Sequence, residues 1–236
     1  MTVLRLRDLG IRAGARDLVR GVDLDVEVGQ VTALAGPSGA GKSITARACL
    51  GVVDVSPGIV SGSLVLPALG PQDWYAAGQE TLRARMAPLR GGVLAYAPQS
   101  ASSALNPGRT IGWQMELSVQ RRQPPPTRAQ TAVLVRDGLA EVGLDAEVAR
   151  ALPGELSGGM CQRAALAIAV AAAPAVLVAD EPETGLDPIL RRQVIELLVA
   201  VGRRHACGVL LITHHADTVE RVADRVVRLQ APEVMA

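Results

Sequence analysis

The distribution of apolar residues along the chain predicts buried strands that alternate with helices. Short runs of Val, Leu, Ile and Ala end in turn residues, as is typical of strands covered on both faces. Longer segments between them repeat their apolar residues with helical spacing. The strands are expected at residues 30–35, 93–96, 175–179, 208–212 and 225–229, and the helices at residues 43–50, 127–142, 162–173 and 188–204. This alternation predicts an α/β fold with a mainly parallel sheet and helices on both of its faces.

Two regions depart from this alternation. Residues 1–35 indicate short strands, because apolar and acidic side chains alternate with a period of two over residues 22–28. Together with a strand at residues 63–66, they predict an N-terminal antiparallel β subdomain. Helical patches and turns predict an inserted α-helical subdomain. We therefore expect one domain over residues 1–236, in which residues 1–99 and 161–236 form the β subdomain and the core, and residues 100–160 form the helical subdomain.

Two helical features give more detailed expectations. The helix at residues 188–204 places five apolar residues on one face: Leu190, Val194, Leu197, Leu198 and Val201. The prolines at positions 124–126 are interpreted as a stiff surface spacer between two helices, or alternatively as a proline-rich recognition motif.

Composition restricts the classes of function. A net charge of +1 gives no general attraction to nucleic acid or to an anionic membrane. The three cysteines, Cys49, Cys161 and Cys207, are far apart and odd in number, which argues against a disulfide framework and a zinc site and favours a reducing cytoplasm. The longest uncharged run, residues 164–179, contains Pro174 and is shorter than the roughly 20 residues of a membrane span. We expect a soluble chain that reaches a membrane only through a partner.

Lys42 is the only lysine in a chain with 24 lysine and arginine residues. It lies in the segment Gly36-Pro37-Ser38-Gly39-Ala40-Gly41-Lys42-Ser43. This segment matches the pattern in which backbone N–H groups cradle phosphates, a lysine reaches the outer phosphates and a hydroxyl binds Mg²⁺. A strand precedes the segment and a helix follows it, as the motif requires. The alternative is a glycine-rich turn before an ordinary helix, but the flanks and the single lysine favour a nucleoside-triphosphate site.

Two adjacent carboxylates, Asp180 and Glu181, follow the strand at residues 175–179. They lie at the carboxyl end of a strand, where open α/β sheets bind ligands. Neighbouring residues that leave a strand point in different directions, so the two can do different work. We expect Asp180 to hold Mg²⁺ and Glu181 to act as general base on an attacking water. The alternative is a solvated acidic turn.

The segment from Leu156 to Arg163, with Ser157, Gly158 and Gly159, is expected just before a helix. Two glycines allow a ligand to approach the backbone, and a helix N-terminus favours an anion. These residues could make a second phosphate contact, although Ser-Gly-Gly at such a place is commonly only a helix cap.

Together these segments resemble the motifs of ABC-transporter ATPases, in family order and over nearly the whole chain. Gly36 to Ser43 resembles Walker A, Gln99 the Q-loop glutamine, Ser157 to Gly159 the signature, Val176 to Glu181 Walker B, Thr184 to Asp187 the D-loop, and Thr213-His214 the switch. The resemblance implies the ABC ATPase fold, built on a P-loop NTPase core, with ATP and Mg²⁺ as ligands.

The resemblance also implies roles for single residues. Two ATPase subunits would form a head-to-tail dimer, so Ser157, Gly158 and Gly159 would contact the nucleotide of the partner. Gln99 would sense Mg²⁺ and the permease, His214 would contact the γ-phosphate and help orient the water, and Asp187 would lie at the nucleotide. The other histidines, His205 and His215, are expected to be solvated.

Within the family, the chain most resembles the ATPase subunits of oligopeptide and nickel importers. Asn106-Pro107 follows Gln99 at their characteristic spacing, and Met160 precedes Gln162-Arg163 as in their signature. This branch, which also serves metallophore uptake, implies a heterodimer under two transmembrane permease subunits, an indirect link to a solute-binding protein, and a peripheral place at the cytoplasmic face of the inner membrane.

Two departures and two alternatives accompany this interpretation. The aromatic residue that usually stacks on adenine aligns near Ala13, and Glu183 stands where the family usually has Thr or Ser. A soluble ABC ATPase that acts on nucleic acid or the ribosome is disfavoured by the single cassette, the absence of heptads and the neutral charge. A non-catalytic nucleotide-binding module is disfavoured because all six motifs are intact.

Overall fold

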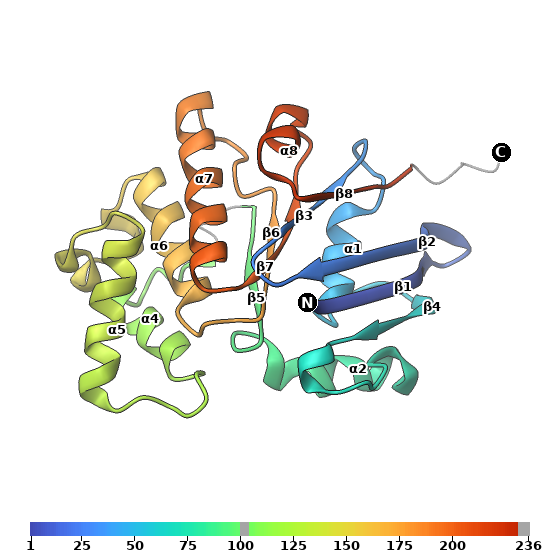
Figure 1. Cartoon of the computed structure of the whole chain (residues 1–236), viewed down its shortest axis with the longest axis horizontal. Helices are drawn as coiled ribbons and strands as arrows, with labels where there is room; N and C mark the ends of the chain where they lie inside the picture. The colour runs from blue at the N-terminus through green and yellow to red at the C-terminus, as the bar shows by residue number, and fades with distance from the viewer. Residues whose placement is uncertain (100–103, 231–236) are drawn as a thin grey trace.

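The computed structural model describes residues 1–99 and 104–230 and contains two sheets (Figure 1). The antiparallel sheet has the order β2-β1-β4, and the parallel sheet has the order β5-β6-β7-β3-β8. The strands are β1 (Thr2–Ala13), β2 (Arg16–Glu27), β3 (Val31–Ala35), β4 (Pro57–Val65), β5 (Leu94–Ala97), β6 (Val176–Asp180), β7 (Gly208–Ile212) and β8 (Arg225–Arg228). Residues 100–103, at the start of the expected helical subdomain, and residues 231–236 lie outside the described part.

Helices cover both faces of the parallel sheet and extend beyond it. They are α1 (Lys42–Cys49), α2 (Gln79–Met86), α4 (Ile111–Val119), α5 (Arg128–Glu141), α6 (Gly158–Val170), α7 (Pro188–Arg204) and α8 (Ala216–Val222). Five short 3-10 helices lie in the connections, at Pro67–Leu69, Tyr75–Ala77, Ala87–Leu89, Ala146–Arg150 and Pro153–Glu155. Within the described residues, no helix is long and apolar enough to cross a bilayer.

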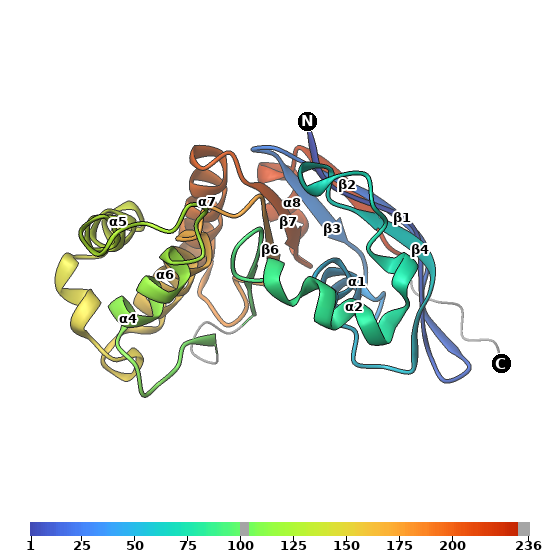
Figure 2. The same ribbon diagram turned by 90° about the horizontal axis from the view of Figure 1, so that it is seen from below.

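Alternate residues of the parallel strands divide between two hydrophobic cores. Val176 and Val178 of β6 join α1 and the antiparallel sheet on one face, whereas Leu177 and Ala179 join α6 and α7 on the other. Side chains of a strand point to opposite faces in turn, so this division follows from the apolar runs. Figure 2 shows α1 and the antiparallel strands on one side of the parallel sheet and α6 and α7 on the other.

The antiparallel sheet presents one apolar face to the first core. In β1, Leu4 and Leu6 are fully buried and pair with Val26 and Leu24 of β2. β1 and β2 have 12 residues each, so the expectation of short strands was wrong. Irregularities in the pairing explain the difficulty, since they interrupt the alternation along β1.

The helical part has a core of its own, formed by α4, α5 and α6. Ile111, Met115 and Leu139 are fully buried there. α6 belongs to both cores, because Cys161 and Ala164 face the helical part while Leu166 and Val170 face the parallel sheet. The division at residue 160 therefore stays a prediction. The prolines at 124–126 lie in the connection between α4 and α5, as the spacer interpretation requires.

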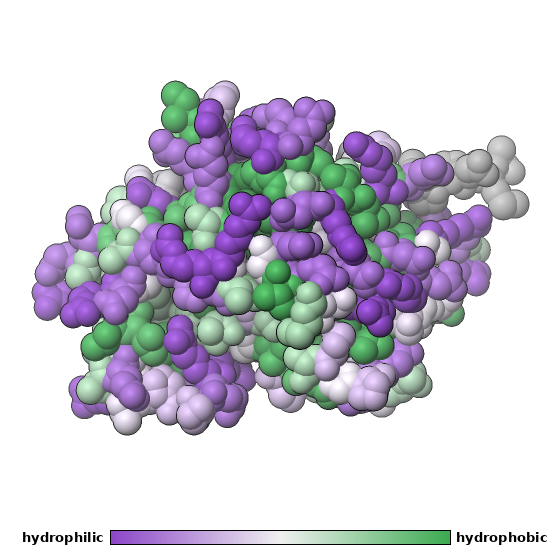
Figure 3. Space-filling view, viewed as in Figure 1, coloured by the Kyte–Doolittle hydropathy of each residue, from purple (hydrophilic) through white to green (hydrophobic). Residues whose placement is uncertain are grey.

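Most other elements match the expected ranges, but β4 begins at Pro57, six residues before the strand expected at residues 63–66. Three further differences concern α6, α2 and α7. α7 and β7 have the bounds predicted for them, whereas α6 begins at Gly158, four residues earlier than expected, and α2 was not predicted. Leu190 was expected on the buried face of α7 but is 37% exposed, and Ile189 beside it is 72% exposed. Figure 3 shows a hydrophobic residue at the upper end of this helix, next to hydrophilic ones.

Candidate functional site

Residues 36–43, called the phosphate loop below, connect β3 to α1, and the shape of this loop depends on glycine. Gly39 and Gly41 have φ angles of 79° and 88°, which favour glycine. A side chain at Gly41 would also place its Cβ 2.7 Å from the carbonyl oxygen of Leu18 and 2.7 Å from Val19 Cγ2. Lys42 begins α1 and is 6% exposed, and its Nζ donates hydrogen bonds to the carbonyl oxygens of Gly36 (3.0 Å) and Pro37 (2.9 Å). The ammonium group therefore lies against the loop that the sequence assigns to phosphates.

Asp180 ends β6 and accepts hydrogen bonds on both carboxylate oxygens. Ser43 Oγ donates to Oδ1 at 2.9 Å, and the Tyr96 hydroxyl donates to Oδ2 at 3.2 Å. Asp180 is 5% exposed, so these two bonds replace most of its contact with water. Burial and the neighbouring Asp180 carboxylate raise the pKa of Tyr96, which keeps its hydroxyl protonated as a donor.

Sequence reasoning missed Tyr96, although a signal for it existed. β5 and β6 are parallel neighbours, and Tyr96 pairs in register with Val178, two residues before Asp180. Residues two apart on a strand share a face, so a polar side chain at this position of β5 can reach the Asp180 side of the sheet.

Glu181 follows Asp180 but points into a different group of side chains. Its Oε2 accepts hydrogen bonds from Gln99 Nε2 (3.4 Å) and Thr184 Oγ1 (3.2 Å), and its Oε1 lies 3.3 Å from His214 Nδ1. The backbone of Glu181 has a φ of 48°, and its N–H donates to the carbonyl oxygen of Ile212. The turn thus separates the two carboxylates, as the sequence predicts.

His214 and His215 lie at the end of β7, with ring centroids 4.1 Å apart. His215 is not solvated as expected, because it is partly buried and its Nδ1 lies 3.4 Å from Arg191 Nη1. Burial, together with the nearby His214 and Arg191, lowers the pKa of His215. His205 was also wrongly expected to be solvated: its Nε2 lies 2.8 Å from Glu141 Oε2 and joins the end of α7 to α5.

Glu183 is a further residue of this region, and it is 1% exposed. Its Oε1 accepts a hydrogen bond from the hydroxyl of Thr213, the residue before His214. A cavity of about 220 Å³ is lined by Gly36, Thr213 and His214, so the phosphate loop and the end of β7 face a common space.

The signature residues lie in the helical part, away from the phosphate loop. Ser157 caps α6 by accepting a hydrogen bond from Met160 N (3.3 Å), and Gly158 and Gly159 form its first turn. Figures 1 and 2 show α6 and α1 on opposite sides of β6. Among the described residues, no hydrogen bond joins Ser157, Gly158 or Gly159 to residues 36–43.

One contact connects this end of α6 to the carboxylate turn, residues 180–183, and a separate cap fixes the start of α7. Gln162 Nε2 donates to the carbonyl oxygen of Pro182, directly after Glu181. Asp187 is exposed and caps α7, with Oδ1 accepting from the backbone N–H groups of Ile189 (2.9 Å) and Leu190 (3.1 Å). Its side chain therefore orients the start of α7 in this chain.

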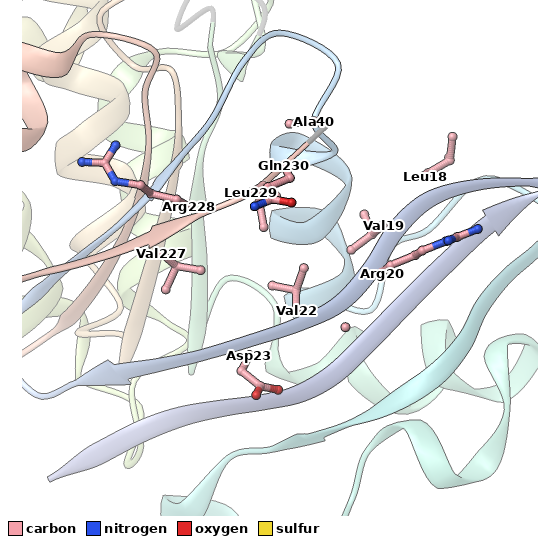
Figure 4. Close-up of a pocket in the computed structure, with 11 residues that line it drawn as sticks. Leu18, Val19, Arg20, Val22, Asp23, Ala40, Val227, Arg228, Leu229 and Gln230 are labelled. Carbon is pink, nitrogen blue, oxygen red and sulfur yellow. The ribbon is translucent and has the colours of Figure 1, made fainter. Parts of the chain in front are cut away.

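A pocket of about 470 Å³ adjoins the phosphate loop between β2 and β8 (Figure 4). Leu18, Val19, Ala40 and Leu229 give it apolar walls, and Arg20 and Arg228 lie on opposite sides of it. No aromatic side chain lines this pocket. The sequence has two tryptophans, two tyrosines and no phenylalanine, and all four aromatic residues lie elsewhere. Trp74 and Tyr75 lie in the core that α1 shares with the antiparallel sheet, and the Tyr96 hydroxyl donates to Asp180. Trp113 of α4 stacks with Arg109. Among the described residues, this pocket thus has no aromatic surface on which a base could stack.

The oxygen atoms of Ser43 and Asp180 fit Mg²⁺. This ion prefers oxygen donors and is usually held by one or two protein groups together with substrate phosphates. The Ser43 hydroxyl and the buried Asp180 carboxylate are in contact at 2.9 Å beside Lys42, so both could turn toward an ion bound with a triphosphate.

Comparison with known proteins found one matching family and several similar import ATP-binding proteins. The family model described as ABC transporter matches residues 19–184. The chain is 32% identical over 219 residues to the glutathione import ATP-binding protein GsiA of Escherichia coli K12, covering 92% of this chain and 35% of that protein. A putative peptide import ATP-binding protein of Brucella ovis is 34% identical over 233 residues, covering 95% of this chain and 67% of that protein. The chain thus spans about a third of the length of the GsiA proteins.

Solved structures show the same fold. The chain is similar to cbiO1 of Clostridium perfringens, part of the transporter complex cbiONQ, with a TM-score of 0.79, 22% identity, and coverage of 98% of this chain and 86% of that one. It is also similar to the ATP-binding cassette MJ0796 in a dimeric post-hydrolysis state, with a TM-score of 0.77, 21% identity, and coverage of 99% and 97%. The fold class predicted from the sequence is confirmed.

Proposed function

The chain belongs to the ABC transporter family, and we propose that it is an ATP-hydrolysing subunit that drives import through a membrane permease. One observation supports hydrolysis most directly. Glu181 is surrounded by Gln99, Thr184 and His214 at 3.2–3.4 Å, one residue after the Asp180 that contacts Ser43. The candidate base, Glu181, thus follows the candidate metal ligand Asp180 at the end of β6, and Asp180 in turn contacts Ser43 at the start of α1.

The proposed reaction assigns one task to each group. Glu181 accepts a proton from a water molecule, whose oxygen attacks the γ-phosphorus while the bond to the bridging oxygen of ADP breaks. His214 and Gln99 contact the carboxylate of Glu181 and hold it in place. His214 would also contact the γ-phosphate and help orient the water, and Gln99 would sense Mg²⁺ and the permease. Lys42 exchanges its bonds to the loop carbonyls for phosphate oxygens. Ser43 and Asp180 would hold Mg²⁺, which when bound neutralises charge on the phosphates.

The position of α6 supports a composite site. Ser157, Gly158 and Gly159 lie on the far side of β6 from α1, and their exposed helix start has free N–H groups suited to an anion. We propose that they contact the nucleotide of a second ATPase subunit, with Asp187 at the same interface, in a head-to-tail arrangement. We propose that this second subunit is a different chain, as in the importers that the sequence most resembles.

Replacing Glu181 by Gln tests the catalytic assignment. The amide keeps the size and the contacts of the side chain but cannot take the proton, so we expect hydrolysis to fall at least a hundredfold, on the scale of about 10²–10⁴ for general base catalysis. Binding of ATP should be retained. The matched control is Glu196→Gln, which changes an exposed carboxylate on α7 and should leave hydrolysis unchanged. Undiminished turnover in Glu181→Gln would refute the assignment.

The cargo is proposed from the relatives alone. The names of the matched proteins refer to glutathione import and peptide import, and we propose a small peptide or peptide-like cargo. Nickel or a metallophore, which the resemblance of the sequence motifs implies and these relatives do not, is the alternative. A solute-binding protein would deliver it to the permease, with this chain at the cytoplasmic face of the inner membrane.

Co-expression tests this assignment against a role on nucleic acid or the ribosome. The chain should co-purify with permease subunits encoded beside it, and they should stimulate its ATPase activity. Stimulation by DNA or ribosomes, without any by the permease, would support the other class instead.

A further inference from the structure

Glu183 is a buried acid for which the proposed reaction has no use. Carboxylates are almost never fully buried without a partner, because burial removes their hydration. Glu183 is 1% exposed, and its only side-chain partner in the described structure is Thr213, through Oε1. The other oxygen, Oε2, is buried without a hydrogen-bond partner among the described residues. Burial of a carboxylate with one unpaired oxygen costs free energy and therefore requires an explanation.

Thr213 connects Glu183 to the backbone on both sides of His214. Thr213 is fully buried, and its hydroxyl donates to Glu183 while accepting from the backbone N–H of His215 at 3.0 Å. A hydroxyl has one proton, so its donor is committed to Glu183 and its acceptor to His215. The residues that flank His214 are therefore both fixed by one network that ends at Glu183.

His214 itself depends on this support. Its side chain is 49% exposed, and among the described residues its only polar contact is Glu181 Oε1 at 3.3 Å. Its ring also packs against that of His215, with centroids 4.1 Å apart, so both of its contacts depend on the backbone of residues 213–215. The position of the imidazole next to Glu181 is thus set by residues 213–215.

Burial is the largest influence on Glu183 and raises its pKa. The Thr213 hydroxyl, His214 and Arg191 of α7 act in the opposite direction and offset this effect only in part. Arg191 also approaches His215 and the carbonyl oxygen of Leu186, so α7, the carboxylate turn and the end of β7 meet around this acid.

We propose that Glu183 is a positioning residue for hydrolysis, which holds His214 against Glu181 by fixing Thr213. This inference rests on the proposed function, since it concerns the geometry of that same site. Threonine or serine, the residues expected here from the family resemblance, have side chains too short to reach the hydroxyl of Thr213 from the same backbone position. The departure at position 183 is therefore a different way of fixing the segment that carries His214.

Enzyme kinetics on three single variants test the proposal. Glu183→Ala and Thr213→Val each break the network, and we expect each to lower kcat about tenfold with KM for ATP changed less than about twofold, because the interaction acts on the reacting geometry and not on binding. Glu183→Gln keeps an acceptor for Thr213 and should retain at least about a third of the activity.

A double-mutant cycle separates positioning from general structural damage. In a His214→Ala background there is no imidazole to position, so Glu183→Ala should cause no further loss of kcat, whereas independent effects would multiply. Wild-type hydrolysis and its loss in Glu181→Gln are measured first and decide the proposed function separately. The inference is overturned if Glu183→Ala retains wild-type kcat, or if its effect is the same with and without His214.

Nuclear magnetic resonance gives a readout that does not depend on turnover. The chain has three histidines, so each imidazole signal can be assigned by replacing them one at a time. Glu183→Ala should shift or broaden the His214 signal and leave that of His205 unchanged, because His205 follows the far end of α7 and contacts Glu141 of α5. An unchanged His214 signal in a folded Glu183→Ala variant would refute the proposal.

Discussion

Replacing Gly41 by Ala should destabilise the chain and abolish nucleotide binding. Two separate penalties arise at this position. The φ of 88° costs a residue with a Cβ roughly 1–2 kcal/mol, and the added carbon would lie 2.7 Å from both the Leu18 carbonyl oxygen and Val19 Cγ2. Since the carbonyl belongs to the backbone of β2, relief requires movement of the strand or of the start of α1, at a further cost of about 1–3 kcal/mol. The expected loss in free energy of unfolding is therefore about 2–5 kcal/mol.

Two other glycines provide matched controls. Gly39 has a φ of 79° and Gly14 has a φ of 57°, and a Cβ at either position would meet no atom within 4 Å. Gly39→Ala and Gly14→Ala should therefore show only the conformational penalty, roughly 1–2 kcal/mol. Gly14 lies in the turn between β1 and β2, outside the phosphate loop, so Gly14→Ala should also bind nucleotide normally.

Urea unfolding and titration with a fluorescent ATP analogue measure the two effects. Gly41→Ala should unfold at a lower urea concentration than Gly39→Ala, and it should show no saturable binding under conditions in which Gly14→Ala binds as the wild type does. If Gly41→Ala and Gly39→Ala were equally stable, the close approach of β2 to the phosphate loop would be refuted.

Two further predictions concern the nucleotide base and the thiols. GTP and CTP should compete with ATP within about tenfold of its affinity, because the pocket beside Ala40 has no aromatic residue on which a base could stack. Such stacking contributes about 1–3 kcal/mol per base. A preference for ATP above a hundredfold in a competition assay would contradict this. Native Cys49 and Cys207 should resist a thiol reagent at pH 8, since burial raises the pKa of each to about 12 and the thiolate is the reactive form, whereas labelling of all three cysteines should follow on unfolding.

The parts of the fold that were predictable share a physical cause. β6 and β7 are buried on both faces and therefore appear in the sequence as uninterrupted apolar runs, and α7 buries apolar residues with helical spacing from Val194 to Val201. α2 lacks this signal, because only Leu82 and Met86 of its eight residues are buried. α6 was predicted to begin late because glycine is a poor helix former, but the Ser157 cap and contacts on both sides of the helix outweigh that preference.

Residues of the candidate site also fall into two groups, those that the sequence identifies and those that it does not. The phosphate loop and the adjacent carboxylates are local patterns, so the sequence alone identifies them. Tyr96, Glu183 and the burial of His215 depend on which side chains meet across neighbouring strands. Spacing along one strand does not determine those meetings, since they also require the order β5-β6-β7 and its register.

That strand order explains why Glu181 contacts residues from both neighbouring strands. β6 lies between β5 and β7, so the residues that follow the three strands meet at one edge of the sheet. From the β5 side, Gln99 reaches Glu181 Oε2 at 3.4 Å, and from the β7 side, His214 reaches Oε1 at 3.3 Å. Gln99 begins the connection to the helical part, whereas His214 is anchored through Thr213 to Glu183, in the same turn as Glu181. A displacement of the helical part would therefore act on one carboxylate oxygen of Glu181, while the other oxygen keeps a partner fixed in the core.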